Sequence, residues 1–158
     1  MRRSKNVVYS IEIKAITKAN STAEQRLQGA PSVKTLRGLK VCDIRGNGWA
    51  ERFYGEHEIP YLEAKNVAAC LRMIDRGRAE VMIQPAAVAY AQLKQTETTN
   101  RLHVLPDVYG RMDFTLLLSR NSEFGADFLE KFDRTLSEMR EDGSLDRLIQ
   151  RLRQSAGG

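Results

Sequence analysis

Residues 39–48 have the sequence LKVCDIRGNG, in which an apolar run leads into a glycine-rich turn. The run predicts a buried strand, and residues 49–54 predict a short helix after the turn. Residues 66–77 predict a second helix with Asn66 as its N-cap, and residues 79–84 predict the next strand. Strands that alternate with helices in this order predict an α/β fold with a largely parallel sheet.

The two ends of the chain have different patterns. Residues 6–17 alternate between apolar and polar side chains, which predicts a strand, and the polar residues 18–32 predict a linker. A short strand is predicted at 102–105 and a longer one at 112–118. Two helices follow, separated at Gly143. The first of them carries an apolar stripe, which consists of Phe124, Phe128, Leu129, Phe132, Leu136 and Met139.

Composition excludes several classes of protein. The chain has 158 residues, of which 42% are hydrophobic and 28% charged, so it is expected to form a globular domain with its own core. It contains no apolar run near the roughly 18 residues that cross a bilayer, and its N-terminal segment lacks the apolar stretch of a signal peptide. The net charge of +5 comes from residues 1–45, which contain ten basic and three acidic residues. Because no aromatic residues alternate with the basic ones, we expect a solvated surface and no nucleic-acid partner.

The residue types that carry catalysis are sparse. His57 and His103 have no third ligand at metal-binding spacing, and neither a serine nucleophile motif nor a complete nucleotide-binding glycine motif occurs. We therefore predict no enzyme activity, no catalytic residue, no metal and no cofactor. Cys42 and Cys70 are too few for a metal motif, and the favoured interpretation is two small buried side chains, with an isolated disulfide left open.

The turn Gly46-Asn47-Gly48 supports two interpretations. A strand that ends in this turn and continues into a helix presents backbone N–H groups at the positive end of the helix dipole, which binds a carboxylate or another anion. The same turn is also a plain structural connection. In open α/β sheets, ligands bind at the carboxyl ends of the strands, which is where this turn is expected.

Four segments together resemble a known family. SVKTLRGLKVCDIRGNGWAERF (32–53), LEAKNVAACLRMIDRGRAEVMI (62–83), RMDFTLLLSRNSEF (111–124) and FDRTLSEMREDGSLDRLIQRL (132–152) are similar, in order and spacing, to bacterial extracellular solute-binding proteins of family 3, the amino-acid receptors of ABC transporters. The resemblance implies a periplasmic-binding-protein-like fold of type II, with one complete lobe and an incomplete first lobe.

The resemblance also implies a division of the chain. Residues 1–35 would be a remnant of lobe one with a crossover strand and linker, and residues 36–110 would be lobe two. Residues 111–158 would hold the return strand and the C-terminal helices. The chain would then be a truncated or divergent member of the family.

Ligand-binding residues follow from the same resemblance. Arg3, seven residues before Ser10, occupies the position of the arginine that binds the α-carboxylate of the ligand. The family usually places an aspartate for the α-ammonium where this chain has Pro85, after Gln84, so binding of a zwitterionic amino acid in the usual way is not expected. The predicted ligand-binding residues are Arg3, Arg45, Gly46, Asn47, Gly48, Trp49 and Gln84.

Two functions of different classes are predicted. The first is non-catalytic binding of a small solute, either an amino acid or another organic anion, with an ABC transporter permease as a further partner. The alternative is a structural or interaction protein that has kept the fold, has lost the ligand cleft and works as a homodimer. For the chain in general we expect a homodimer built from the C-terminal helices and the strand near residues 6–17. The family is periplasmic, so we expect a periplasmic protein if a leader was removed, and a cytoplasmic one otherwise.

Overall fold

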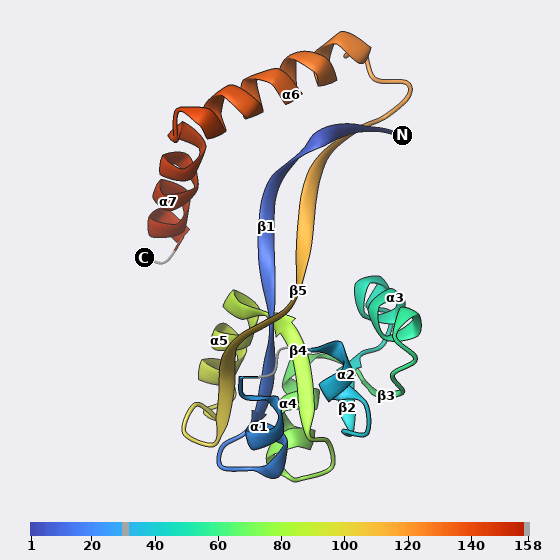
Figure 1. The fold of residues 1–158 in the computed structure, drawn as a ribbon, viewed down its shortest axis with the longest axis vertical. Coiled ribbons are helices and arrows are strands. Elements are labelled where there is room, and N and C mark those ends of the chain that lie inside the picture. The colour runs from blue at the N-terminus through green and yellow to red at the C-terminus, as the bar shows by residue number, and fades with distance from the viewer. Residues whose placement is uncertain (30–31, 157–158) are drawn as a thin grey trace. The chain divides into compact units, whose positions relative to one another are not determined.

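The computed structural model describes residues 1–29 and 32–156, and Figure 1 shows their fold. The chain divides into two compact units, Ile11–Met112 and the pair of segments Met1–Ser10 and Asp113–Gly158. Five strands of the described residues form one sheet in the order β3-β2-β4-β1-β5. They are β1 (Arg2–Lys18), β2 (Val41–Ile44), β3 (Tyr61–Ala64), β4 (Val81–Pro85) and β5 (Leu102–Leu118).

The pairing of the strands confirms the α/β class. β2 pairs in parallel with both β3 and β4, whereas β1 pairs antiparallel with β4 through Ile13–Thr17. β1 and β5 are neighbours in the sheet, so the segments predicted as the crossover strand and the return strand belong to adjacent strands. The boundaries expected for lobes at residues 35 and 110 stay predictions.

Both faces of the sheet in the Ile11–Met112 unit are covered by helices. Val81 and Ile83 of β4 point into one core, and Met82 between them points into the other. A strand buried on both faces needs a continuous apolar run, which is what β4 has. The first core is closed by α1 (Thr22–Leu27), α2 (Val33–Leu36) and α3 (Gly48–Glu56), and the second by α4 (Val67–Asp75) and α5 (Ala86–Gln95).

Two sequence-based predictions about local structure are wrong. Part of the predicted linker 18–32 is helix α1. The side chain of Ser21 caps this helix, and the side chain of Leu27 anchors it because it is fully buried. Residues 30 and 31 of the predicted linker lie outside the described residues. The two strands predicted around Pro106 are one continuous strand, β5. β5 lies at an edge of the sheet, where a proline does not remove a pairing hydrogen bond. In contrast, the predicted N-cap at Asn66 is confirmed.

The favoured interpretation of the two cysteines is also wrong. Cys42 of β2 and Cys70 of α4 are both buried, as expected, but they form a disulfide, with their Cα atoms 5.7 Å apart. Both side chains belong to the core between the sheet and α4. The fold thus brings together two residues that are 28 positions apart in sequence, a proximity that sequence spacing does not reveal.

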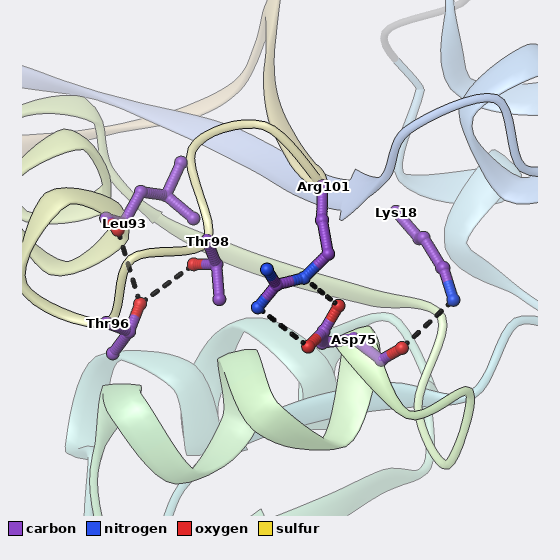
Figure 2. A network of polar contacts seen from close by, with 6 residues as sticks. All are labelled: Lys18, Asp75, Leu93, Thr96, Thr98 and Arg101. Carbon is purple, nitrogen blue, oxygen red and sulfur yellow. Dashed lines mark hydrogen bonds and ion pairs between the residues drawn. The ribbon is translucent and has the colours of Figure 1, made fainter.

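A polar network joins three elements of this unit (Figure 2). Arg101, just before β5, donates two hydrogen bonds to the carboxylate of Asp75 at the end of α4, at 2.9 and 3.2 Å. Lys18, the last residue of β1, donates to the carbonyl of Asp75 at 3.0 Å. The Arg101 guanidinium lowers the pKa of the Asp75 carboxyl.

The second unit contains α6 (Ala126–Glu141) and α7 (Ser144–Ala156). Asp133 of α6 accepts hydrogen bonds from the backbone N–H groups of Lys5 and Asn6, at 2.9 and 3.0 Å, and Arg140 donates to the carbonyl of Val7. α6 is therefore attached to the first part of β1 by polar contacts. The predicted separation of the two helices at Gly143 is confirmed, since this residue has a φ of +71°, a conformation that favours glycine.

Loss of the disulfide is expected to destabilise the fold. Replacing both residues (Cys42→Ala with Cys70→Ala) frees a loop of 28 residues in the unfolded chain. Chain entropy predicts a loss of about 3–4 kcal/mol in the free energy of unfolding, measured by urea denaturation. The wild-type protein unfolded with reductant serves as the control and is expected to show a similar loss. Equal stability with and without the disulfide would contradict this expectation.

The Asp75–Arg101 pair is expected to contribute a pH-dependent stabilisation. Because the folded pKa of Asp75 lies below its unfolded value of about 3.9, the contribution is present above that pH and is lost as pH falls through the folded pKa. Arg101→Gln should therefore reduce stability slightly at neutral pH and weaken the acid dependence. Arg72→Gln, which removes another exposed charge, should leave the acid dependence unchanged in denaturation curves from pH 2 to pH 7.

Candidate functional site

The carboxyl ends of β2 and β4 contain a buried polar cluster. Asp43 of β2 has no exposed surface, and its Oδ1 atom accepts hydrogen bonds from the Ile44 N–H at 2.7 Å and the Asn47 amide at 3.1 Å. The amide of Gln84, from β4, approaches the same oxygen at 3.4 Å. The hydroxyl of Tyr54, from α3, donates to Oδ2 at 3.0 Å. One carboxylate therefore connects two strands, the turn and the helix.

Burial determines the electrostatics of this cluster. Removal of the carboxylate from water raises the pKa of Asp43, and the hydrogen bonds from Ile44, Asn47 and Tyr54 offset only part of that effect. Burial and the nearby Asp43 charge raise the pKa of the Tyr54 hydroxyl, which therefore stays protonated as a donor. The donors around Asp43 are neutral groups, so the cluster holds a carboxylate by hydrogen bonding and not by ion pairing.

The turn after β2 contains the N-cap residue of α3 and determines how this helix begins. Gly46 has a φ of +74°, which a residue with a side chain adopts only at a cost. Asn47 is the N-cap residue of α3, but its side chain makes no capping hydrogen bond because it donates to Asp43 instead. The first N–H groups of α3 thus have no side-chain cap among the described residues, and they carry the positive end of the helix dipole.

The arginines considered for the site have different surroundings. Arg45 forms an ion pair with Glu63 at 2.7 Å, so its charge is already compensated. Arg52, one helical turn into α3, donates to the carbonyl of Gly48 at 3.2 Å, which places its guanidinium beside the turn. Arg3 lies in the unit of Met1–Ser10, exposed in β1. Its predicted role stays a prediction.

Aromatic rings cover the adjacent face of α3. Trp49 and Phe53 stack with their ring centroids 4.8 Å apart, and both are partly buried against the core. With Arg52 and Glu56 they line a hollow of about 200 Å³. The lining of the hollow therefore combines two aromatic rings with Arg52, the arginine that lies beside the turn.

The structure brings together most of the residues that the sequence singled out. Gly46, Asn47, Gly48 and Trp49 are continuous in the turn and the first turn of α3, and Gln84 joins them through Asp43. Gln84 is buried and its amide is directed to Asp43, so it is connected to the turn through that carboxylate. Sequence reasoning missed Asp43, Tyr54 and Arg52. An aspartate inside an apolar strand, in the sequence VCDI, is the signal that could have identified the first of them.

No group of His, Cys, Asp or Glu residues within the described part of the chain could hold a metal ion. Among the same residues, none of the helices has the length and apolar character that a membrane span requires.

Comparisons with known proteins identify the fold. No protein-family profile and no curated protein matches the sequence. Among solved structures, the GluR0 ligand-binding core from Nostoc punctiforme in complex with L-glutamate superimposes with a TM-score of 0.59 at 15% identity, over 94% of this chain and 63% of that one. A mutant of ArgBP from T. maritima has a TM-score of 0.62 at 16% identity, over 95% and 60%.

A third similar structure is an amino acid ABC transporter substrate-binding protein, AbpA, from Streptococcus pneumoniae bound to L-arginine. It has a TM-score of 0.58 at 19% identity, over 94% of this chain and 59% of that one. The chain therefore has the periplasmic-binding-protein-like fold of amino-acid-binding proteins, which confirms the predicted resemblance at the level of the fold. It spans about 60% of the length of the structures to which it is similar.

The buried carboxylate is expected to make stability depend on pH in the opposite direction to Asp75. Because the folded pKa of Asp43 is raised, ionisation costs stability as pH rises from the unfolded pKa of about 3.9 toward the folded pKa. In Asp43→Asn the amide oxygen can accept the same hydrogen bonds, and its NH2 group can donate to Tyr54. Relative to this variant, the wild type should lose up to about 1.4 kcal/mol per pH unit in that window. A constant difference in urea denaturation between pH 4 and pH 8 would contradict the assignment.

Proposed function

We propose that the chain binds a small solute that carries a carboxylate, of the amino-acid or organic-anion class, without transforming it. The observation that carries the proposal is the side chain of Asn47, which is turned toward Asp43 and away from the N-terminus of α3. A solute carboxylate placed at Gly46-Asn47-Gly48 would accept hydrogen bonds from the N–H groups of α3 that the Asn47 side chain leaves uncapped.

The surroundings of the turn support the same class of solute. Arg52 adds a positive charge beside Gly48, and a bidentate arginine–carboxylate contact is among the strongest available to such a site. The hollow lined by Trp49 and Phe53 would accept the apolar part of a small molecule. Two of the similar structures were solved with an amino acid bound, L-glutamate in one and L-arginine in the other, which supports amino acids as the first compounds to test.

The disulfide supports an assignment to the periplasm. Disulfides form and persist in oxidising compartments, and Cys42 and Cys70 are joined within the unit Ile11–Met112, which carries the turn. An ABC transporter permease is the further partner that such a location would provide. Arg45 completes the proposed set of ligand-binding residues in this unit, where the solute would replace Glu63 as its partner.

A glycine substitution tests the site. A Cβ atom at Gly48 would meet no neighbour within 4 Å, and the same holds for Gly55 at the other end of α3. Gly48→Val should therefore leave the fold intact and obstruct the N–H groups of the turn, whereas Gly55→Val is the matched control. We expect the two variants to unfold within about 1 kcal/mol of each other.

The measurement is thermal unfolding with L-glutamate, L-arginine, L-glutamine and simple dicarboxylates. A solute at 100 times its Kd adds about 2.7 kcal/mol, which raises Tm by roughly 5–10 °C for a chain of this size. The increase should occur in the wild type and in Gly55→Val and be lost in Gly48→Val. A solute that stabilises all three proteins equally would exclude the turn as its site.

A further inference from the structure

One face of α3 carries an arginine, a glutamate and two aromatic rings. Trp49, Arg52, Phe53 and Glu56 are spaced so that they lie on the same side of the helix, and together they line the hollow of about 200 Å³. Sites that enclose a whole small molecule measure about 300–1,000 Å³. The hollow is therefore large enough for one part of a solute, and the rest of that solute would lie along α3.

The two aromatic rings of this face are held in place by their neighbours. Trp49 and Phe53 stack on each other, and the ring of Phe53 contacts His57 edge-on, with the centroids 5.1 Å apart. A Cβ atom at Gly110 of β5 would lie 3.7 Å from an atom of each ring, so the backbone of that strand packs directly against the stack. A surface that is already ordered loses little entropy on binding, and the faces of aromatic rings attract cations as well as apolar groups.

Glu56 carries a negative charge that the fold does not use. It is the last residue of α3 and is exposed, at the negative end of the helix dipole, so its charge is unfavourable for the helix itself. The last turn of α3 contains no basic residue, and the ion pairs among the described residues do not include Glu56. Arg52 is turned the other way, toward the carbonyl of Gly48, and Arg111 of β5 is paired with Glu12 at 3.7 Å. The carboxylate of Glu56 is thus available to a cation in the hollow.

The two ends of α3 therefore attract opposite charges. At the N-terminus the uncapped N–H groups and Arg52 favour an anion, whereas at the C-terminus the helix dipole and Glu56 favour a cation. At a rise of about 1.5 Å per residue, Glu56 is about 12 Å from Gly48 along the helix axis and about 6 Å from Arg52. The α-ammonium group of an amino acid is too close to its own carboxylate to span this separation. A solute that satisfies both ends needs a cation farther along its chain.

We propose that Glu56 selects solutes in which an alkyl chain separates the cation from the carboxylate, the class of ω-amino and ω-guanidino acids. This proposal rests on the proposed function, because it keeps the carboxylate at the turn beside Arg52. The alkyl chain would cross the rings of Trp49 and Phe53, and the cation would lie in the hollow between the aromatic stack and Glu56. Glu56 is then the residue that distinguishes a cationic end of the solute from a neutral or an anionic one.

Solutes with the same carbon chain and different ends test this selection. The probes are ε-aminocaproate, which ends in an ammonium group, caproate, which ends in a methyl group, and adipate, which ends in a second carboxylate. Trp49 is the only tryptophan of the chain, so its fluorescence reports directly on the hollow. The wild type should bind ε-aminocaproate about fivefold more tightly than caproate, because an exposed ion pair and a cation–π contact each contribute modestly. Adipate should bind more weakly than caproate.

Two glutamates of α3 provide matched variants. Glu56→Gln should remove the preference for ε-aminocaproate over caproate. Glu51→Gln should keep that preference, because Glu51 is also exposed on α3 but does not line the hollow. Circular dichroism melting of both variants checks that the fold is retained. A preference that survives in Glu56→Gln would overturn the proposal.

The outcomes distinguish the role of Glu56 from the site of the carboxylate. Equal binding of ε-aminocaproate and caproate by the wild type, lost in Gly48→Val, would overturn the role of Glu56 and leave the turn as the carboxylate site. A preference that depends on Glu56 but is unaffected by Gly48→Val would support the role of Glu56 and remove the carboxylate from the turn. Unchanged Trp49 fluorescence with all three probes would overturn the selection by Glu56.

Discussion

The structure around the turn depends on one buried carboxylate. Asp43 lies where β2 ends, and its two oxygens connect the strand, the turn, α3 and β4 through hydrogen bonds from neutral donors. A buried carboxylate is costly unless its lone pairs are satisfied, so each donor in this cluster is constrained in position. The orientation of Asn47 follows from that constraint, and so does the uncapped N-terminus of α3.

This arrangement exchanges one kind of stabilisation for another. An asparagine at an N-cap normally contributes about 1 kcal/mol by accepting a hydrogen bond from its own helix. Here its amide is used to satisfy Asp43, and the helix end is left for a different acceptor. Arg52 strengthens the positive potential at the same place, because its side chain returns along α3 to the carbonyl of Gly48. The physical chemistry of the turn therefore favours an anion even though Arg45 is paired with Glu63.

The two units have different sources of stability. The Ile11–Met112 unit has a sheet covered on both faces and a disulfide between β2 and α4. In the other unit, few apolar side chains are buried among the described residues, and polar contacts from Asp133 and Arg140 attach α6 to β1. A helix pair with so small an apolar core gains from any partner that covers its remaining face.

Sequence alone determined the class of fold, because hydrophobic periodicity and capping residues are local properties. The apolar run of β4, the N-cap at Asn66 and the glycine after α6 all belong to patterns a few residues long. The turn at Gly46-Asn47-Gly48 was likewise visible as a possible anion site. The helix α1 was missed although its capping serine is local, since the surrounding residues are polar and only Leu27 anchors it in the core.

Tertiary structure decided which groups meet. Neither the Cys42–Cys70 disulfide nor the hydrogen bond between Asp43 and Gln84 has a signature in sequence spacing, because each depends on how β2 packs against α4 and β4. The pairing of Arg45 with Glu63 depends in the same way on the register of β2 and β3. Long-range neighbours therefore decide the contact of Asp43 with Gln84 and the ion pair of Arg45, whereas Asn47 and Arg52 each contact a residue four positions away. The chemistry of the proposed site is therefore a property of the folded chain, whereas its predicted location follows from ten consecutive residues, 39–48.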